Sequence, residues 1–203
     1  MSAHAVLRQA GADPGAAQGA LADGTTVLAR AHWPAGQVQS LPAVAGFVVS
    51  AFSPLAAALA DLCLTSYFGD PPGDPALGER TAIVLASGTG DLPTAAAVAS
   101  AVTEGRRVPP LLFYQSNPNA VAGHIAARWG LAGPVTCTVS AADPLAEAMS
   151  DAALLIADGA AHAALVIVAN AYAGGDADGD ALLIGPVAWP PASRPPATGA
   201  APS

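Results

Sequence analysis

Short runs of uninterrupted apolar residues mark the strands that the sequence predicts. The runs Arg80–Ala86 (RTAIVLA) and Ala163–Ala169 (AALVIVA) lack the polar alternation of a half-exposed strand, so they predict strands buried on both faces of a sheet. Val135–Val139 and Asp180–Val187 are two further predicted strands, and each follows a glycine-containing turn. Thr25–Trp33 alternates partly and is rich in β-branched and aromatic residues, which indicates another strand or an extended edge segment.

A segment nearer the amino terminus, Ala3–Gln9, is also a strand candidate, and the pattern leaves open which of the two enters the main sheet. Strands that alternate with helices predict an α/β fold, with a parallel or mixed sheet covered by helices on both faces. A chain of 203 residues suits one domain, which we predict over residues 1–188. The proline- and alanine-rich residues 189–203 are predicted to be a disordered tail.

Apolar residues at three- and four-residue spacings predict a long buried helix over Leu41–Leu64, which Pro54 is expected to kink or divide. No charged residue occurs from Ala31 to Ala60, so part of this segment is about long enough to cross a bilayer. Its prolines and serines, and the absence of flanking basic clusters, favour a buried helix over a membrane span.

Other helices are predicted where a capping residue precedes a helical pattern. They are Leu92–Glu104, a helix capped by Asn117 or Asn119 that runs to about Trp129, and Leu145–Ala157. Asp143 and Pro144 suit the N-cap and the first turn of the last of these helices. The turn-rich segment Phe68–Gly78 is interpreted as a connector, and Leu111–Tyr114 as an aromatic-bearing loop.

The charge content narrows the classes of function. The chain has a net charge of −8, no lysine, and 53% hydrophobic residues. It offers no basic patch to neutralise phosphates, which argues against nucleic acid as a partner. So little charge indicates that another subunit covers part of the apolar surface. The amino terminus does not resemble a signal peptide. Cys63 and Cys137 lie in apolar segments and are predicted to be free thiols. Both observations favour a cytoplasmic location.

Few residues have the spacing that a catalytic site or a metal site requires. Asp143 occupies a strand-to-helix turn where many α/β enzymes hold a nucleophile, and its default interpretation is a structural helix cap. His124 is a lone helical histidine, and His162 lies beside a predicted helix-to-strand turn. An acid–base pair of Asp143 with His124 is a minor alternative. The acidic run Asp176–Asp180 lacks the glycine and glutamate positions of a calcium loop. The sequence therefore indicates no metal site and no cofactor.

Four motifs occur in order between Arg80 and Gly185: SGTGD (87–91), VPPLLFYQSNPNA (108–120), NAVAGHIAARWGLAGP (119–134) and DGDALLIG (178–185). Together they resemble the amino-terminal half of the β-ketoacyl-acyl-carrier-protein synthase family, with its Gly-Thr-Gly turn, Ser-Pro-x-x-Phe loop, Asn-Ala-x-Ala-Gly-x-Ile helix and Glu-Gly-Ala-x-x-Leu-x-Leu strand. The resemblance implies half of a thiolase-like fold, in which a five-stranded mixed sheet is covered by helices on both faces.

The departures from this family bear directly on activity. The position of the family's nucleophilic cysteine falls on Asp143, and a carboxylate is a poor acyl acceptor there. The family's two catalytic histidines and its lysine motif belong to a carboxyl-terminal half outside this sequence, which contains no lysine. We therefore expect no intrinsic condensing activity. In the family, the strand before the nucleophile pairs across a two-fold axis, and here that strand would be Val135–Ser140.

The leading hypothesis is a non-catalytic subunit similar to truncated chain-length factors. It would pair with a catalytic β-ketoacyl synthase in type II polyketide, polyene or fatty-acid-like biosynthesis and shape its acyl tunnel, with acyl carrier protein as an indirect partner. The expected acyl-tunnel and interface residues are Leu112, Phe113, Tyr114, Cys137, Val139, Ser140 and Asp143. The alternative is a homodimeric acyl-binding or scaffold protein with a degenerate ketosynthase fold and no pathway catalysis.

Overall fold

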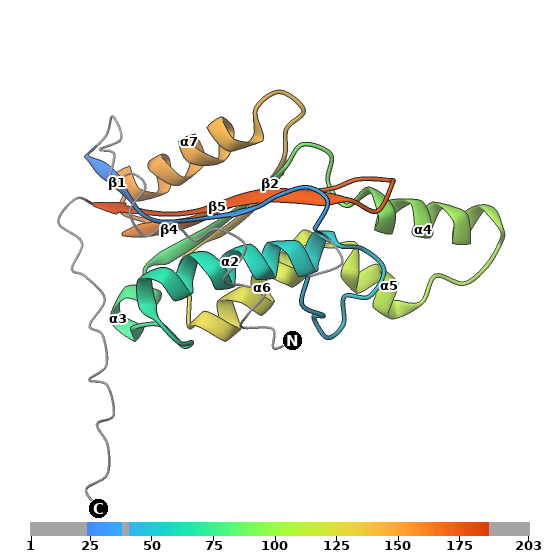
Figure 1. Cartoon of the computed structure of the whole chain (residues 1–203), viewed down its shortest axis with the longest axis horizontal. Helices are drawn as coiled ribbons and strands as arrows, with labels where there is room; N and C mark the ends of the chain where they lie inside the picture. Colours follow the sequence, from blue (N-terminus) through green and yellow to red (C-terminus); the bar gives the residue numbers. More distant parts are fainter. Residues whose placement is uncertain (1–23, 38–40, 187–203) are drawn as a thin grey trace, which may run out of the picture.

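A five-stranded mixed sheet organises the protein, with helices on both of its faces (Figure 1). The structure is a computed structural model and describes residues 24–37 and 41–186. The strand candidate Ala3–Gln9 and the tail 189–203 lie outside the described residues. The five-stranded mixed sheet expected from the family resemblance is confirmed.

The sheet has the order β1-β5-β4-β2-β3. Its strands are β1 (Thr25–Trp33), β2 (Thr81–Ser87), β3 (Val135–Val139), β4 (Ala163–Ala171) and β5 (Ala177–Pro186). The strand β2 runs parallel to both β3 and β4, whereas β5 runs antiparallel to β4 and β1. In this sheet β1 and β3 form the two edges, and Thr25–Trp33 is confirmed as a strand.

The predicted buried strands are confirmed with small shifts at their ends. All seven residues of β2 are buried, as are all but one of the nine in β4, which explains their uninterrupted apolar runs. The last strand begins at Ala177, three residues earlier than predicted, so residues 177–179 belong to the strand and not to the glycine-containing turn before it. At Gly179 a Cβ atom would meet the carbonyl oxygen of Val168, and the missing side chain is what lets β5 continue there.

One face of the sheet is covered by α2 (Phe52–Phe68) and α6 (Pro118–Trp129), which lie below the strands in Figure 1. Every residue from Phe52 to Ala60 is buried, because the sheet covers α2 on one side and α6 with the preceding segment covers it on the other. Asn117 caps α6 through its side chain, as one of the two predicted caps, and Gly130 ends the helix in a left-handed conformation.

The helix predicted over Leu41–Leu64 is wrong over its first eleven residues. Gly46 adopts a positive φ of 89° within a turn closed by Val44 and Phe47, and α2 begins only at Phe52. Pro54 therefore lies in the first turn of α2, where its missing N–H costs no helical hydrogen bond, and no kink is required. At its other end α2 continues past Leu64 to Phe68.

The opposite face is covered by α7 (Pro144–Ala157), which packs on β2, β4 and β3. A second, smaller apolar core lies beneath it, built from small side chains such as Ala148 and Ala152 on the helix and Val84 and Val166 on the strands. The predicted helix Leu145–Ala157 and its cap are thus confirmed.

Three further helices lie around this framework: α3 (Pro75–Gly78), α4 (Leu92–Thr103) and α5 (Pro110–Gln115). The interpretation of Leu111–Tyr114 as a loop is therefore wrong, and a short helix also interrupts the connector Phe68–Gly78. Figure 1 shows α4 extending beyond the end of the sheet. Within the two described ranges, no helix is both long enough and apolar enough to cross a membrane.

Candidate functional site

The turn between β3 and α7 holds Asp143 in the role of a helix cap. Its Oδ1 accepts a hydrogen bond of 2.9 Å from the backbone N–H of Ala146, in the first turn of α7. Glu147, in the same turn, accepts a bond of 2.7 Å from the hydroxyl of the buried Ser140. Both side chains of this turn therefore bind local donors, and Asp143 itself is exposed to solvent.

A polar network joins the carboxyl ends of β2 and β4 next to this turn. Asn170 Oδ1 accepts from the backbone N–H of Gly88 at 2.9 Å, and its Nδ2 donates to Asp178 at 3.2 Å. The Tyr172 hydroxyl also donates to Asp178, at 3.1 Å, and burial together with this carboxylate raises the pKa of Tyr172. The Ser87 hydroxyl accepts from the N–H of Gly90 and so shapes the Gly-Thr-Gly turn. These bonds fix the loops that surround the site.

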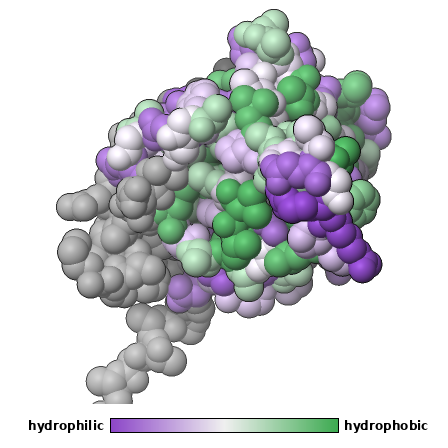
Figure 2. Space-filling view, turned by 90° about the vertical axis from the view of Figure 1, so that its right-hand side faces the viewer, coloured by the Kyte–Doolittle hydropathy of each residue, from purple (hydrophilic) through white to green (hydrophobic). Residues whose placement is uncertain are grey.

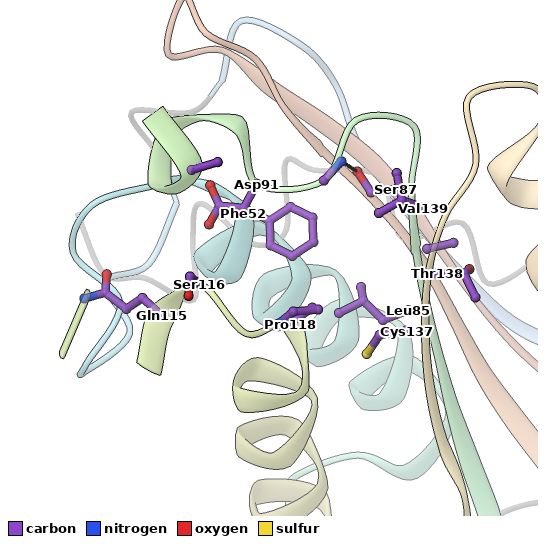
Figure 3. A pocket seen from close by; sticks show the side chains of 13 residues that line it. Phe52, Leu85, Ser87, Asp91, Gln115, Ser116, Pro118, Cys137, Thr138 and Val139 are labelled. Atoms are coloured by element: carbon purple, nitrogen blue, oxygen red, sulfur yellow. Dashed lines mark hydrogen bonds between the residues drawn. The ribbon is translucent and has the colours of Figure 1, made fainter. Parts of the chain in front are cut away.

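An apolar cavity of about 240 Å³ opens between the carboxyl ends of β2 and β3 and the helices α4, α5 and α6 (Figure 3). Its wall is mainly hydrophobic and includes Phe52, Leu85, Pro118, Cys137 and Val139. Burial raises the pKa of Cys137, because the thiolate loses solvation in this wall. The cavity therefore suits a flexible apolar chain and leaves Cys137 protonated and weakly nucleophilic.

The structure separates the predicted tunnel residues into two groups. Cys137 and Val139 line the cavity, whereas Leu112, Phe113 and Tyr114 belong to α5 and do not line it. Leu112 is buried, but the Phe113 side chain is 76% exposed. Phe113 and Tyr114 thus point to a surface role of α5 rather than to the cavity wall of this chain.

Gln115 is a buried polar residue that the sequence analysis missed. Its Oε1 accepts from the backbone N–H groups of Val48 and Val49, and its Nε2 donates to the carbonyl of Leu111. It thereby fastens the segment before α2 onto α5, and the ring of Phe47 packs against Tyr114 at a centroid distance of 5.6 Å. A glutamine that follows an apolar run is too weak a signal to reveal this contact.

Exposed apolar side chains gather at this end of the molecule. The α5 surface, as we call it, consists of Val48, Val49, Leu111, Phe113 and Tyr114. Figure 2, which looks at the end that α4 and α5 occupy, shows hydrophobic residues spread over much of that face. An apolar surface of this kind is typical of a contact with another protein.

The strand β3 forms one edge of the sheet, and its last residue, Val139, lines the cavity together with Ser116 next to α5. Among the described strands it pairs with β2 alone, and Val135 and Val139 are both exposed, Val139 to 66%. The hydroxyls of Thr136 and Thr138, on the opposite side of the strand from Cys137, are buried without a hydrogen-bond partner. An unpaired edge of this composition is a template for a further strand.

The other candidates from the sequence do not join this site. His124 lies on α6 and Asp143 caps α7, which cover opposite faces of the sheet, so they form no acid–base pair. In the acidic run, the carboxylate of Asp176 accepts from backbone N–H groups, and that of Asp180 contacts His32. Over the described parts of the chain, no group of three or more His, Cys, Asp or Glu residues is placed to hold a metal ion.

The model of the β-ketoacyl synthase N-terminal domain matches residues 75–174. This segment contains β2, β3, β4, the Gly-Thr-Gly turn, all of the cavity wall except Phe52, and the cap of α7. This part of the chain thus matches the amino-terminal domain of β-ketoacyl synthases. A comparison with curated protein sequences gives no match.

Solved structures of ketosynthases share the fold of this chain. A ketosynthase in complex with its chain length factor from Xenorhabdus doucetiae has a TM-score of 0.55 at 18% identity, covering 68% of this chain and 58% of that one. The ishigamide ketosynthase/chain length factor has a TM-score of 0.57 at 21% identity, covering 76% and 49%. A type II polyketide acyl carrier protein in complex with its ketosynthase gives 0.52 at 16%, covering 68% and 48%. The matched part of this chain thus spans about half the length of those proteins.

Proposed function

We propose that this chain is a non-catalytic ketosynthase-like subunit that pairs with a catalytic β-ketoacyl synthase and shapes its acyl tunnel. The observation that carries the proposal is the turn between β3 and α7, where the family resemblance aligns Asp143 with the nucleophile. There the carboxylate caps a helix, and nothing in its contacts prepares it to attack an acyl group. We expect a cytoplasmic location, as for the pathway it would serve.

The two thiols of the chain are poor substitutes for the missing nucleophile. Cys63 is fully buried in α2, and burial raises its pKa to about 12. Cys137 is half-buried and its pKa is also raised. A nucleophilic cysteine needs a lowered pKa and access to substrate, so neither thiol meets the requirement.

The cavity supports a role in holding an acyl chain. It is apolar and measures about 240 Å³, somewhat below the range of roughly 300–1,000 Å³ that drug-sized ligands occupy. It would therefore accept a short stretch of acyl chain rather than a whole product. Filling it would shorten the chain that the paired enzyme can build.

The α5 surface and the β3 edge, whose last residue Val139 lines the same cavity as Ser116 next to α5, would supply a contact for the partner. Apolar association needs contiguous exposed side chains, which Phe113 and Tyr114 provide beside Val48. We infer that the predicted tunnel residues of α5 act toward the partner's side of the interface. One neighbouring structure is a ketosynthase in complex with its chain length factor, and another is a ketosynthase/chain length factor, which supports the pairing.

The test is co-expression with a tagged ketosynthase encoded beside this chain, followed by co-purification and analysis of product length. The substitution Ala95→Leu adds volume at the cavity wall and should shift the products toward shorter chains. Ala96→Leu is the matched control, because Ala96 is an exposed neighbour on α4 that does not line the cavity. Separate migration of the two proteins, with a ketosynthase that is fully active alone, would refute the proposal.

A further inference from the structure

A second cavity of about 240 Å³ lies between α2, α6 and the segment that precedes α2, and we call it the Arg128 cavity. None of its described lining residues lines the cavity at the ends of β2 and β3. Much of its wall is apolar and comes from residues 42–45 and from Pro54, Ala57 and Ala58. The rest of the wall is polar and consists of Asp61, His124 and Arg128. An apolar wall and a charged end therefore meet in one small space.

The spacing of residues along α6 places the two basic side chains together. His124 and Arg128 are four residues apart, so they lie one turn apart on the same face of the helix. Both also line a second, more open hollow beside Pro71 and Pro72. The Arg128 side chain is 47% exposed. A small molecule in the Arg128 cavity can therefore reach both side chains.

Asp61 holds the Arg128 guanidinium through one of its nitrogens. Asp61 Oδ1 accepts hydrogen bonds from Arg128 Nε at 2.8 Å and from the indole N–H of Trp129 at 2.7 Å. These two donors, one of them cationic, offset the negative charge of Asp61 within the chain. In the described part of the chain, the two terminal amino groups of Arg128 have no hydrogen-bond acceptor. That edge of the guanidinium is therefore free to bind an anion.

His124 adds further hydrogen-bonding capacity beside this edge. Its ring is positioned by the buried Phe47, in an edge-on contact with 6.5 Å between the ring centroids. Neither ring nitrogen of His124 bonds to any residue within the described ranges. An imidazole donates from one nitrogen in either neutral tautomer. His124 and Arg128 can thus donate together to one anionic group.

We propose that the Arg128 cavity binds a small carboxylic acid, with the carboxylate on Arg128 and His124 and a short hydrocarbon chain against the apolar wall. A planar carboxylate matches the fork of N–H groups that a guanidinium presents. The volume lies below the roughly 300–1,000 Å³ of sites for drug-sized ligands, so the acid has about six carbons at most. The inference rests on this local geometry and not on the proposed pairing with a ketosynthase.

The test is an NMR titration of the ¹⁵N-labelled chain with hexanoate and, separately, with acetate. The indole N–H of Trp129 is a local reporter, because it bonds to Asp61 in the cavity wall. Its resonance should shift and saturate, whereas that of Trp33, which lines neither hollow, should stay in place. Hexanoate should bind at least about tenfold more tightly than acetate, because it buries additional CH₂ groups.

Four variants separate the two parts of the site. Arg128→Met should weaken hexanoate binding about tenfold or more. Arg106→Met is the matched control, because Arg106 is an exposed, ion-paired arginine that lines neither hollow. His124→Phe removes the ring nitrogens and should weaken binding about threefold. Ala45→Leu fills the cavity from an exposed position and should abolish the advantage of hexanoate over acetate while leaving acetate binding unchanged.

Several results would overturn the proposal. They are a shift that never saturates, equal affinity for hexanoate and acetate, tighter binding of inorganic phosphate than of hexanoate, and full affinity in Arg128→Met. Co-purification with a ketosynthase is measured separately. A chain that pairs with the ketosynthase but does not bind hexanoate overturns this site alone. A chain that binds hexanoate at Arg128 without pairing supports the site and refutes only the proposed function.

Discussion

The N-cap interpretation of Asp143 makes a quantitative prediction. Its side chain is exposed, and its Oδ1 accepts a hydrogen bond from the N–H of Ala146, in the first turn of α7. Asp143→Ala removes that acceptor, which typically costs about 1 kcal/mol of stability at an N-cap. For a domain of this size, a loss of about 1 kcal/mol lowers the Tm by about 2–4 °C. Asp143→Asn keeps the cap oxygen and should stay close to wild type.

The assay is thermal and urea unfolding of all three proteins, followed by circular dichroism. A chain-length-factor-like role also requires that Asp143→Asn leave co-purification with the ketosynthase and its product profile unchanged. If the asparagine variant were as unstable as the alanine variant, charge rather than capping would explain the aspartate. If it folded normally but abolished turnover in the complex, Asp143 would have a chemical role and the non-catalytic assignment would fail.

Three further predictions concern stability. Gly133→Ala should lower the free energy of unfolding by several kcal/mol, because the new Cβ atom would lie 2.6 Å from the backbone of Thr81. Gly123→Ala, which faces open space on α6, should raise it by about 0.5–1 kcal/mol, as measured by urea unfolding. Asp61→Ala should lower the free energy of unfolding by about 1–3 kcal/mol, because the buried indole N–H of Trp129 loses the acceptor that lies 2.7 Å away. The control Arg128→Met removes only the exposed ion-pair partner of Asp61 and should lower it by less than about 1 kcal/mol. Folding raises the pKa of Cys63 from 9.0 to about 12, because burial disfavours the thiolate. The free energy of unfolding should therefore be unaffected by this thiol below pH 9 and should fall by about 1.4 kcal/mol per pH unit as the pH rises toward 12. Cys63→Ala should remove this pH dependence, and an unchanged dependence would argue against Cys63 as its source.

Local signals explain which parts of the fold the sequence predicts. Asp143 followed by Pro144 identifies the start of α7 because capping depends on a few consecutive residues. The apolar runs of β2 and β4 identify central strands because both of their faces are buried. In each case the physical cause lies within the segment itself.

The errors arise where distant residues decide the local structure. The segment 41–51 has helical spacing, yet its N–H groups at Val48 and Val49 bind the side chain of Gln115, more than sixty residues away. The six residues of α5 are too few to show a helical period, so the sequence pattern predicts a loop there. The sequence pattern does not predict the cavity either, because Phe52, Ala95 and Pro118 become neighbours only through the tertiary fold.

The open edge of β3 has a consequence for how the protein must be produced in a cell. A short strand of valine, threonine and cysteine, with no charge or proline along its free side, offers a nucleus on which extended segments of other unfolded chains can add. Copies made in excess of their binding partners would be the ones exposed to this hazard. Synthesis in matched amounts, with assembly soon after folding, would therefore protect solubility as well as activity.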